Sequence, residues 1–170
     1  ENITVGQVTT TNTGATAVTL TTREDAIVDG GNAGGADVIA GGRLVIDAVT
    51  GVGNGAALET TVASVDIDNA TSGNIEISDT NAITVFKAVQ GTAGNIGLAA
   101  GGTITVDNAG GNAITVLGTG TVTLDANGAA RDLLVNDGLL SVNGAITLTA
   151  DNDVTFLATG DISSTAGAIS

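Results

Sequence analysis

One short pattern recurs throughout the chain: an aliphatic residue, a threonine and a second apolar residue. Because side chains alternate between the two faces of a β-strand, this pattern places both apolar residues on one face and the threonine on the other. Two related triplets, Val65–Ile67 and Ile75–Ile77, carry a carboxylate in the middle. The pattern therefore predicts many short strands, each with one buried face. The threonine triplets are Ile3–Val5, Val18–Leu20, Ile83–Val85, Ile104–Val106, Ile114–Val116, Val122–Leu124, Ile146–Leu148 and Val154–Phe156.

The segments between the triplets favour turns. They are rich in Gly, Asn, Asp, Ser and Thr, the residue types that satisfy turn geometry. The 170 residues include 26 glycines and no proline. No long stretch repeats its apolar residues with the period of a helix, so no helix is expected.

The triplets belong to a longer repeat. When residues 71–85 are aligned with residues 92–106, seven of 15 positions are identical. The same shift along the chain relates Leu44 to Val65, and the aliphatic residues two positions further on match as well. A repeat of about 20 residues that contains several strands is typical of a solenoid.

The repeat also predicts which residues stack on one another. Ile75 matches Ile96 in this alignment, and slightly shorter steps lead on to Ile114 and Leu133. In a β-helix, equivalent residues of successive coils lie one above the other. We therefore expect Ile75, Ile96 and Ile114 to form one interior column.

Two all-β architectures fit short strands with frequent turns. A sandwich or barrel also has turns about every 8–12 residues. It gives no reason, however, for the Gly-Asn-Ile phrase at positions 73–75 to recur at positions 94–96. A parallel β-helix explains the repeat, and Val, Ile, Leu and Ala suit its narrow core.

We expect an all-β parallel β-helix, or β-solenoid, with about 20 residues per coil and about eight coils. Residues 1–170 are expected to form a single segment without recognisable caps.

Several phrases resemble the repeats of filamentous-haemagglutinin-like exoproteins. They are Thr71–Ile77, Gly94–Leu98 and Gly144–Ala150, and Ala57–Val62 resembles a phrase of giant β-strand-repeat proteins. The resemblance implies a right-handed β-helical shaft from a long, secreted bacterial surface protein. It is best from about residue 44 onward.

Charge and composition exclude several classes of function. The chain has 18 acidic and 4 basic side chains, so its net charge of −14 repels nucleic acid. It has no His and no Cys, which removes most zinc, haem and iron–sulfur sites and all histidine or thiol catalysis. No apolar stretch is long enough to predict a membrane span. Without Trp or Tyr to stack on a sugar, the chain is not expected to be an enzyme.

Calcium is the one cofactor that the sequence suggests. Asp66, Asp68, Asp151 and Asp153 place pairs of oxygen ligands close together in sequence, as calcium needs. Asp37 lies in a segment that loosely matches a calcium-binding Gly-rich nonapeptide, although Asn32 and Ala33 replace two of its glycines. The alternative is that these residues make turns and keep the rod soluble.

The two aromatic residues receive different predictions. Phe156 keeps the inward parity of Val154, so we expect it to fill the core. Phe86 directly follows Val85 and breaks the alternation, which indicates a corner or an exposed position.

These observations favour a structural role. We expect an extracellular, secreted or cell-surface fibre or adhesin-shaft segment that forms a filament by end-to-end continuation of its coils. Its principal partner would then be itself, as further copies or as adjacent repeats of a longer chain. The alternative is a binding module that recognises a glycan or protein through its loops or one face of the rod.

Overall fold

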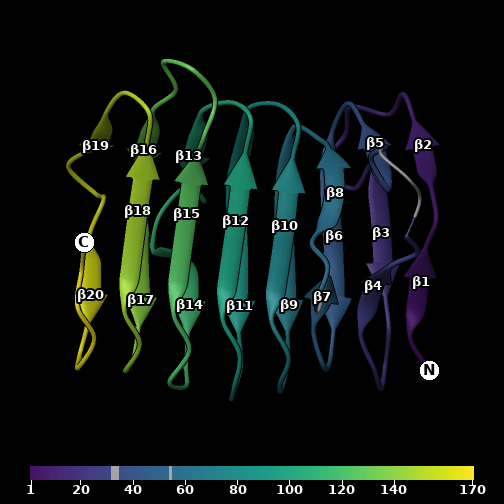
Figure 1. The fold of residues 1–170 in the computed structure, drawn as a ribbon, viewed down its shortest axis with the longest axis horizontal. Helices are drawn as coiled ribbons and strands as arrows, with labels where there is room; N and C mark the ends of the chain where they lie inside the picture. Colours follow the sequence, from purple (N-terminus) through teal and green to yellow (C-terminus); the bar gives the residue numbers. More distant parts are fainter. Residues whose placement is uncertain (32–34, 54) are drawn as a thin grey trace.

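The chain folds into a parallel β-solenoid. The computed structural model describes residues 1–31, 35–53 and 55–170, and these residues form strands, turns and loops with no helix. Their strands belong to two sheets of ten strands each, in which successive turns pair in parallel. The predicted fold class is therefore confirmed. Figure 1 shows the turns side by side along the long axis of the molecule.

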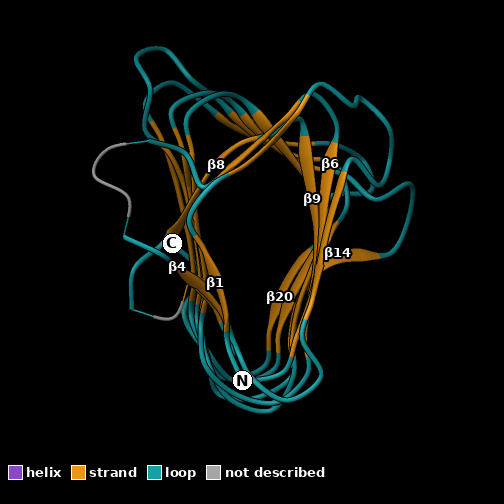
Figure 2. Ribbon diagram, turned by 90° about the vertical axis from the view of Figure 1, so that its right-hand side faces the viewer, coloured by secondary structure: helices purple, strands orange, loops and turns teal. Residues whose placement is uncertain are grey.

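The two sheets form facing walls, which we call wall A and wall B, and loops connect them into a closed circuit (Figure 2). Wall A contains β1 (Ile3–Val5), β2 (Val8–Thr10), β4 (Ile27–Asp29), β5 (Val38–Ala40), β7 (Val52–Gly53), β8 (Leu58–Thr61), β10 (Ile75–Asp79), β12 (Ile96–Ala100), β15 (Val122–Ala126) and β18 (Ile146–Ala150). Wall B contains β3 (Val18–Thr21), β6 (Arg43–Ala48), β9 (Ser64–Asn69), β11 (Ile83–Gln90), β13 (Ile104–Val106), β14 (Asn112–Val116), β16 (Leu133–Val135), β17 (Gly138–Ser141), β19 (Val154–Phe156) and β20 (Ile162–Ser164).

Several turns are longer than the sequence repeat suggests. In wall A, the turn that leads from Ile96 to its partner Val122 contains more residues than the turn that leads from Ile75 to Ile96. The described chain therefore completes about seven turns rather than eight. The extra length comes from loops such as 107–111, which separates two strands of wall B within one turn.

The alternation within the triplets predicts the buried face correctly. Ile83, Val85, Ile104 and Val106 are all buried in the core. The threonines between them, such as Thr105, are half-buried on the outer face. The interior between the walls is therefore filled almost entirely by aliphatic side chains.

The predicted column of Ile75, Ile96 and Ile114 is only partly right. Ile75 lies beside Ile96 in wall A, but Ile96 is followed by Val122. Ile114 lies in wall B, where it pairs with Leu139. Each turn carries similar triplets on both walls. The short spacing between Ile96 and Ile114 therefore relates a strand of wall A to a strand of wall B, not two stacked strands of one wall.

Glycines form a column at the corner where the chain enters wall A. Each lies two residues before the first wall A residue of its turn, as in Gly94, Gly120 and Gly144. A Cβ atom on Gly120 would lie 1.8 Å from the carbonyl oxygen of Gly94, and one on Gly144 would lie 1.8 Å from the oxygen of Gly120. Successive turns therefore approach so closely that no side chain fits between them.

Buried polar side chains bind the turns together near this corner. The Asn69 Nδ2 atom donates a hydrogen bond of 2.9 Å to Gln90 Oε1 on the next turn. Ser141 Oγ donates to the Gly120 carbonyl oxygen at 3.1 Å and accepts from the Gly144 amide at 3.0 Å. The two Ser141 bonds satisfy backbone groups that the corner would otherwise leave unpaired inside the protein.

The glycine column predicts a strong effect of one added methyl group. We expect Gly120→Ala to lower the free energy of unfolding by about 3 kcal/mol, since the new Cβ forces two backbones apart. Gly97→Ala is the matched control, because the nearest atom to its Cβ would lie 4.0 Å away. Urea unfolding monitored by circular dichroism measures both. Equal stabilities of the two variants would contradict the close approach of the turns.

The inside–outside assignment predicts a second difference. Ile96→Asp buries a carboxylate without a partner, which costs several kcal/mol, so we expect the variant to unfold at a much lower temperature or not to fold. Thr105→Asp lies on the outer face, and its melting temperature should change little. Thermal unfolding of both purified variants checks this, and similar losses of stability would show that the two faces are misassigned.

Candidate functional site

Large apolar side chains are exposed chiefly at one end of the described solenoid, on the turn formed by β18, β19 and β20. Exposed large apolar residues in the described part of the chain are Leu117, three residues of this turn (Val154, Phe156 and Leu157), and Ile169, which follows β20 and pairs with Ile146 of β18. Elsewhere, the turns cover one another and leave few such groups in contact with water. The last turn is therefore the most distinctive surface of the rod.

Phe156 has the predicted parity but not the predicted burial. It pairs in register with Val135, which is fully buried, yet the Phe156 side chain is 49% exposed. Phe156 is exposed because β19 pairs with β16 on one side and with no described strand on the other. The prediction that Phe156 fills the core is therefore wrong, although its side chain continues the column of core residues.

The exposed residues surround an apolar hollow. Its volume is about 300 Å³, and its lining continues the interior of the preceding turns. The lining residues are Leu148, Val154, Phe156, Ile162, Ile169 and Ser170. Beside it, β19 and β20 each have a strand edge without a ladder partner among the described residues. This end thus offers both apolar surface and backbone hydrogen-bonding groups.

The five aspartates predicted as calcium ligands lie at three separate places. Asp151 and Asp153 occupy the exposed turn between β18 and β19. Asp151 Oδ2 accepts a hydrogen bond of 2.7 Å from the amide of Ala130 on the turn before. This carboxylate therefore links two successive turns of the solenoid.

Asp66 and Asp68 lie on the outer face of β9 beside basic side chains. Lys87 Nζ lies 3.3 Å from Asp66 Oδ1 and also forms an ion pair with Asp68. The Arg43 guanidinium approaches Asp66 Oδ2 at 4.0 Å. The Lys87 ammonium group therefore bridges these two carboxylates.

Phe86 lies at an irregularity in wall B. The pairing of β11 with β9 shifts register between Val85 and Lys87, and Phe86 is the residue between them. Its ring is half-buried, with the Arg43 guanidinium carbon 3.5 Å from the ring centre. A bulge thus explains why Phe86 breaks the alternation, and the cation covers the face of the ring.

Asp37 lies in a different environment, next to two acidic residues, Asp29 and Glu59, that belong to none of the predicted calcium motifs. Asp29 is the last residue of β4, Asp37 directly precedes β5, and Glu59 lies on β8. One carboxylate oxygen from each lies within 4.8 Å of the others.

Asp37 and Glu59 are separated in sequence by the length of one turn of the solenoid, and this spacing is the sequence signal that relates them. The residues that follow them, Val38 and Thr60, are ladder partners on adjacent turns. The rest of the predicted nonapeptide cannot be placed in the same way, because Asn32 and Ala33 lie outside the described residues.

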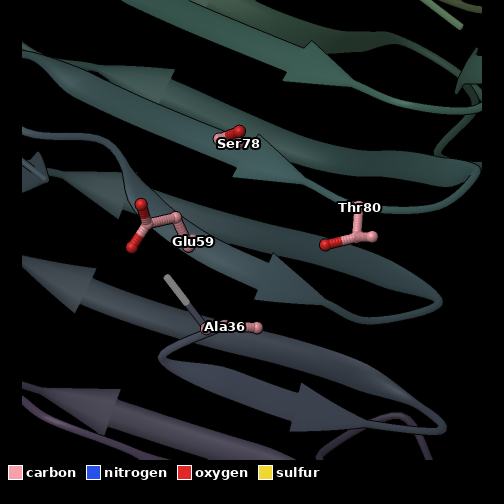
Figure 3. A pocket seen from close by; sticks show the side chains of 5 residues that line it. Ala36, Glu59, Ser78 and Thr80 are labelled. Carbon is pink, nitrogen blue, oxygen red and sulfur yellow. The ribbon is translucent and has the colours of Figure 1, made fainter. Parts of the chain in front are cut away.

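A surface hollow of about 180 Å³ adjoins this acidic group. It is lined by Gly35, Ala36, Glu59, Ser78 and Thr80, and Figure 3 shows Glu59 between Ala36 and Ser78. The hollow gives the Glu59 carboxylate access to solvent.

Comparisons with protein-family models, with curated protein sequences and with solved structures find no match to this chain. The described residues include no helix long and apolar enough to cross a membrane.

Proposed function

We propose that the chain is a structural shaft segment of an extracellular fibre or adhesin stalk, extended end to end by continued stacking of β-helical coils. The observation that carries this proposal is the open last turn. There, Val154 and Phe156 extend the buried column of Leu133 and Val135 into solvent. One more coil in the same register would bury them.

Backbone pairing favours the same arrangement. The free edges of β19 and β20 can each pair with another parallel strand. Their opposite edges already pair in this way with β16 and β17. At the opposite end, β1, β2 and β3 each pair with a single described strand. The two ends are different surfaces, so an end-to-end contact is heterologous and generates a filament rather than a closed ring.

Charge directs the contact to the ends. A net charge of −14 makes the sides of neighbouring rods repel one another. The apolar hollow at the last turn carries no charged lining residue among the described part of the chain. The resemblance of the repeat phrases to filamentous-haemagglutinin-like exoproteins supports the extracellular and cell-surface location of such a shaft.

The test changes the exposed column without touching the rest of the rod. Phe156→Asp places a carboxylate where the next coil would cover it, so we expect much shorter fibres in negatively stained electron micrographs. Burial of that charge costs several kcal/mol per contact. Light scattering over a wide concentration range should show a matching loss of the large species.

Thr155→Asp is the matched control. It adds the same charge on the same strand, but at the alternate position that points away from the column. We expect its fibres to resemble those of the unmodified protein. Isolated short rods of the unmodified protein at every concentration, or equal fibre lengths for Phe156→Asp and Thr155→Asp, would contradict the proposal.

A further inference from the structure

We propose that Asp29, Asp37 and Glu59 bind one calcium ion on wall A, where β4, β5 and β8 come together. This site is independent of the filament proposal. It joins segments from neighbouring turns of the solenoid and is distant in sequence from the open last turn.

The separation of the carboxylates fits one calcium ion. One oxygen atom from each lies within 4.8 Å of the other two. Calcium–oxygen distances are about 2.3–2.6 Å, so two ligands on opposite sides of one ion are at most about 5 Å apart. The three side chains can therefore reach a common ion without rearrangement of the backbone.

The Asp37 carboxylate provides the independent indication of a ligand. The residue is 0% exposed, and its Oδ1 atom has no hydrogen-bond partner among the described residues. Its Oδ2 atom accepts a hydrogen bond of 2.9 Å from the Glu59 amide, and this fixes the carboxylate beside β8. A buried acceptor without a partner destabilises the fold, so native proteins supply such an atom with water or an ion.

Asp79 shows how the same fold treats a buried carboxylate that needs no ion. One of its oxygens accepts hydrogen bonds from Thr60 Oγ1 at 2.7 Å and from the Val62 amide at 3.0 Å. The other accepts from the Asn81 amide at 2.8 Å. Both oxygens of Asp79 are satisfied by protein donors, whereas Asp37, whose carboxylate belongs to the acidic group, keeps one oxygen without a donor among the described residues.

The charges around Asp37 require compensation. Burial raises the pKa of Asp37, and the nearby charges of Asp29 and Glu59 raise it further. Among the described residues, the ion pairs of Arg43 and Lys87 involve other carboxylates, those of Asp66 and Asp68. A divalent cation would reverse this repulsion and stabilise all three ionised groups.

The donor chemistry selects calcium. The ligands are carboxylate oxygens only, and the chain contains no His or Cys that would favour zinc or copper. Calcium accepts six to eight oxygen ligands in variable geometry, whereas magnesium demands a compact octahedron. Water entering through the adjoining hollow can complete the coordination of the larger ion.

The experiment measures calcium binding to the whole chain after treatment with a chelator. Isothermal titration with calcium chloride should give one site per chain, and calcium should raise the melting temperature because it binds only the folded protein. Magnesium chloride at the same ionic strength should give a clearly smaller shift. We expect Glu59→Gln and Asp37→Asn each to weaken calcium binding on the order of 10-fold or more, since each removes a charged ligand.

The control is the double variant Asp151→Asn and Asp153→Asn, which removes two carboxylates from another turn and should keep the full calcium response. A loss of calcium binding could also result from misfolding, and Glu59→Gln separates the two causes. The Glu59 side chain reaches solvent, so this variant should keep its fold in chelator. The proposal is overturned if the unmodified protein gives no calcium response. It is equally overturned if magnesium matches calcium, or if Glu59→Gln and Asp37→Asn bind calcium as tightly as the unmodified protein.

Discussion

The parallel hydrogen-bond ladder between successive turns is the interaction on which the other features of this protein depend. One turn holds only a few short strands and cannot bury its own apolar residues. The ladder places Ile77 beside Leu98 and Leu98 beside Leu124, and all three are buried. The core therefore exists only where turns cover one another, and Phe156 shows what an uncovered position looks like.

The spacing of the ladder also dictates the composition of the corners. Neighbouring strands lie about 4.7–4.9 Å apart, so corner backbones that follow the same spacing leave no room for a Cβ atom between them. Glycines such as Gly120 meet this limit. The corner carbonyls still need donors, and the buried amides of Asn69 and Gln90 supply them, for example to the Ser72 and Ala93 oxygens. Glycine and buried amides thus recur here for structural reasons.

The sequence predicts the faces of the strands more readily than their partners. Alternation identifies which residues are buried, and the internal repeat correctly pairs Leu44 with Val65. The register after Ile96 could not be predicted, because both walls carry the same kind of triplet and loop length decides which of them meet. The link between Asp37 and Glu59 was missed for a related reason: it appears only when the true length of that turn is known.

Like charges on adjacent turns are a hazard of this architecture, since a ladder brings equivalent positions together. On wall B, Asp47 pairs directly with Asp68, and such pairs are destabilising unless compensated. The chain places Lys87 there, in contact with Asp68. On wall A, Asp37 and Glu59 meet on adjacent turns in the same way, but no ion pair among the described residues reaches them. The same physical problem is solved by a side-chain cation on one wall, and on the other it calls for a cation from solution.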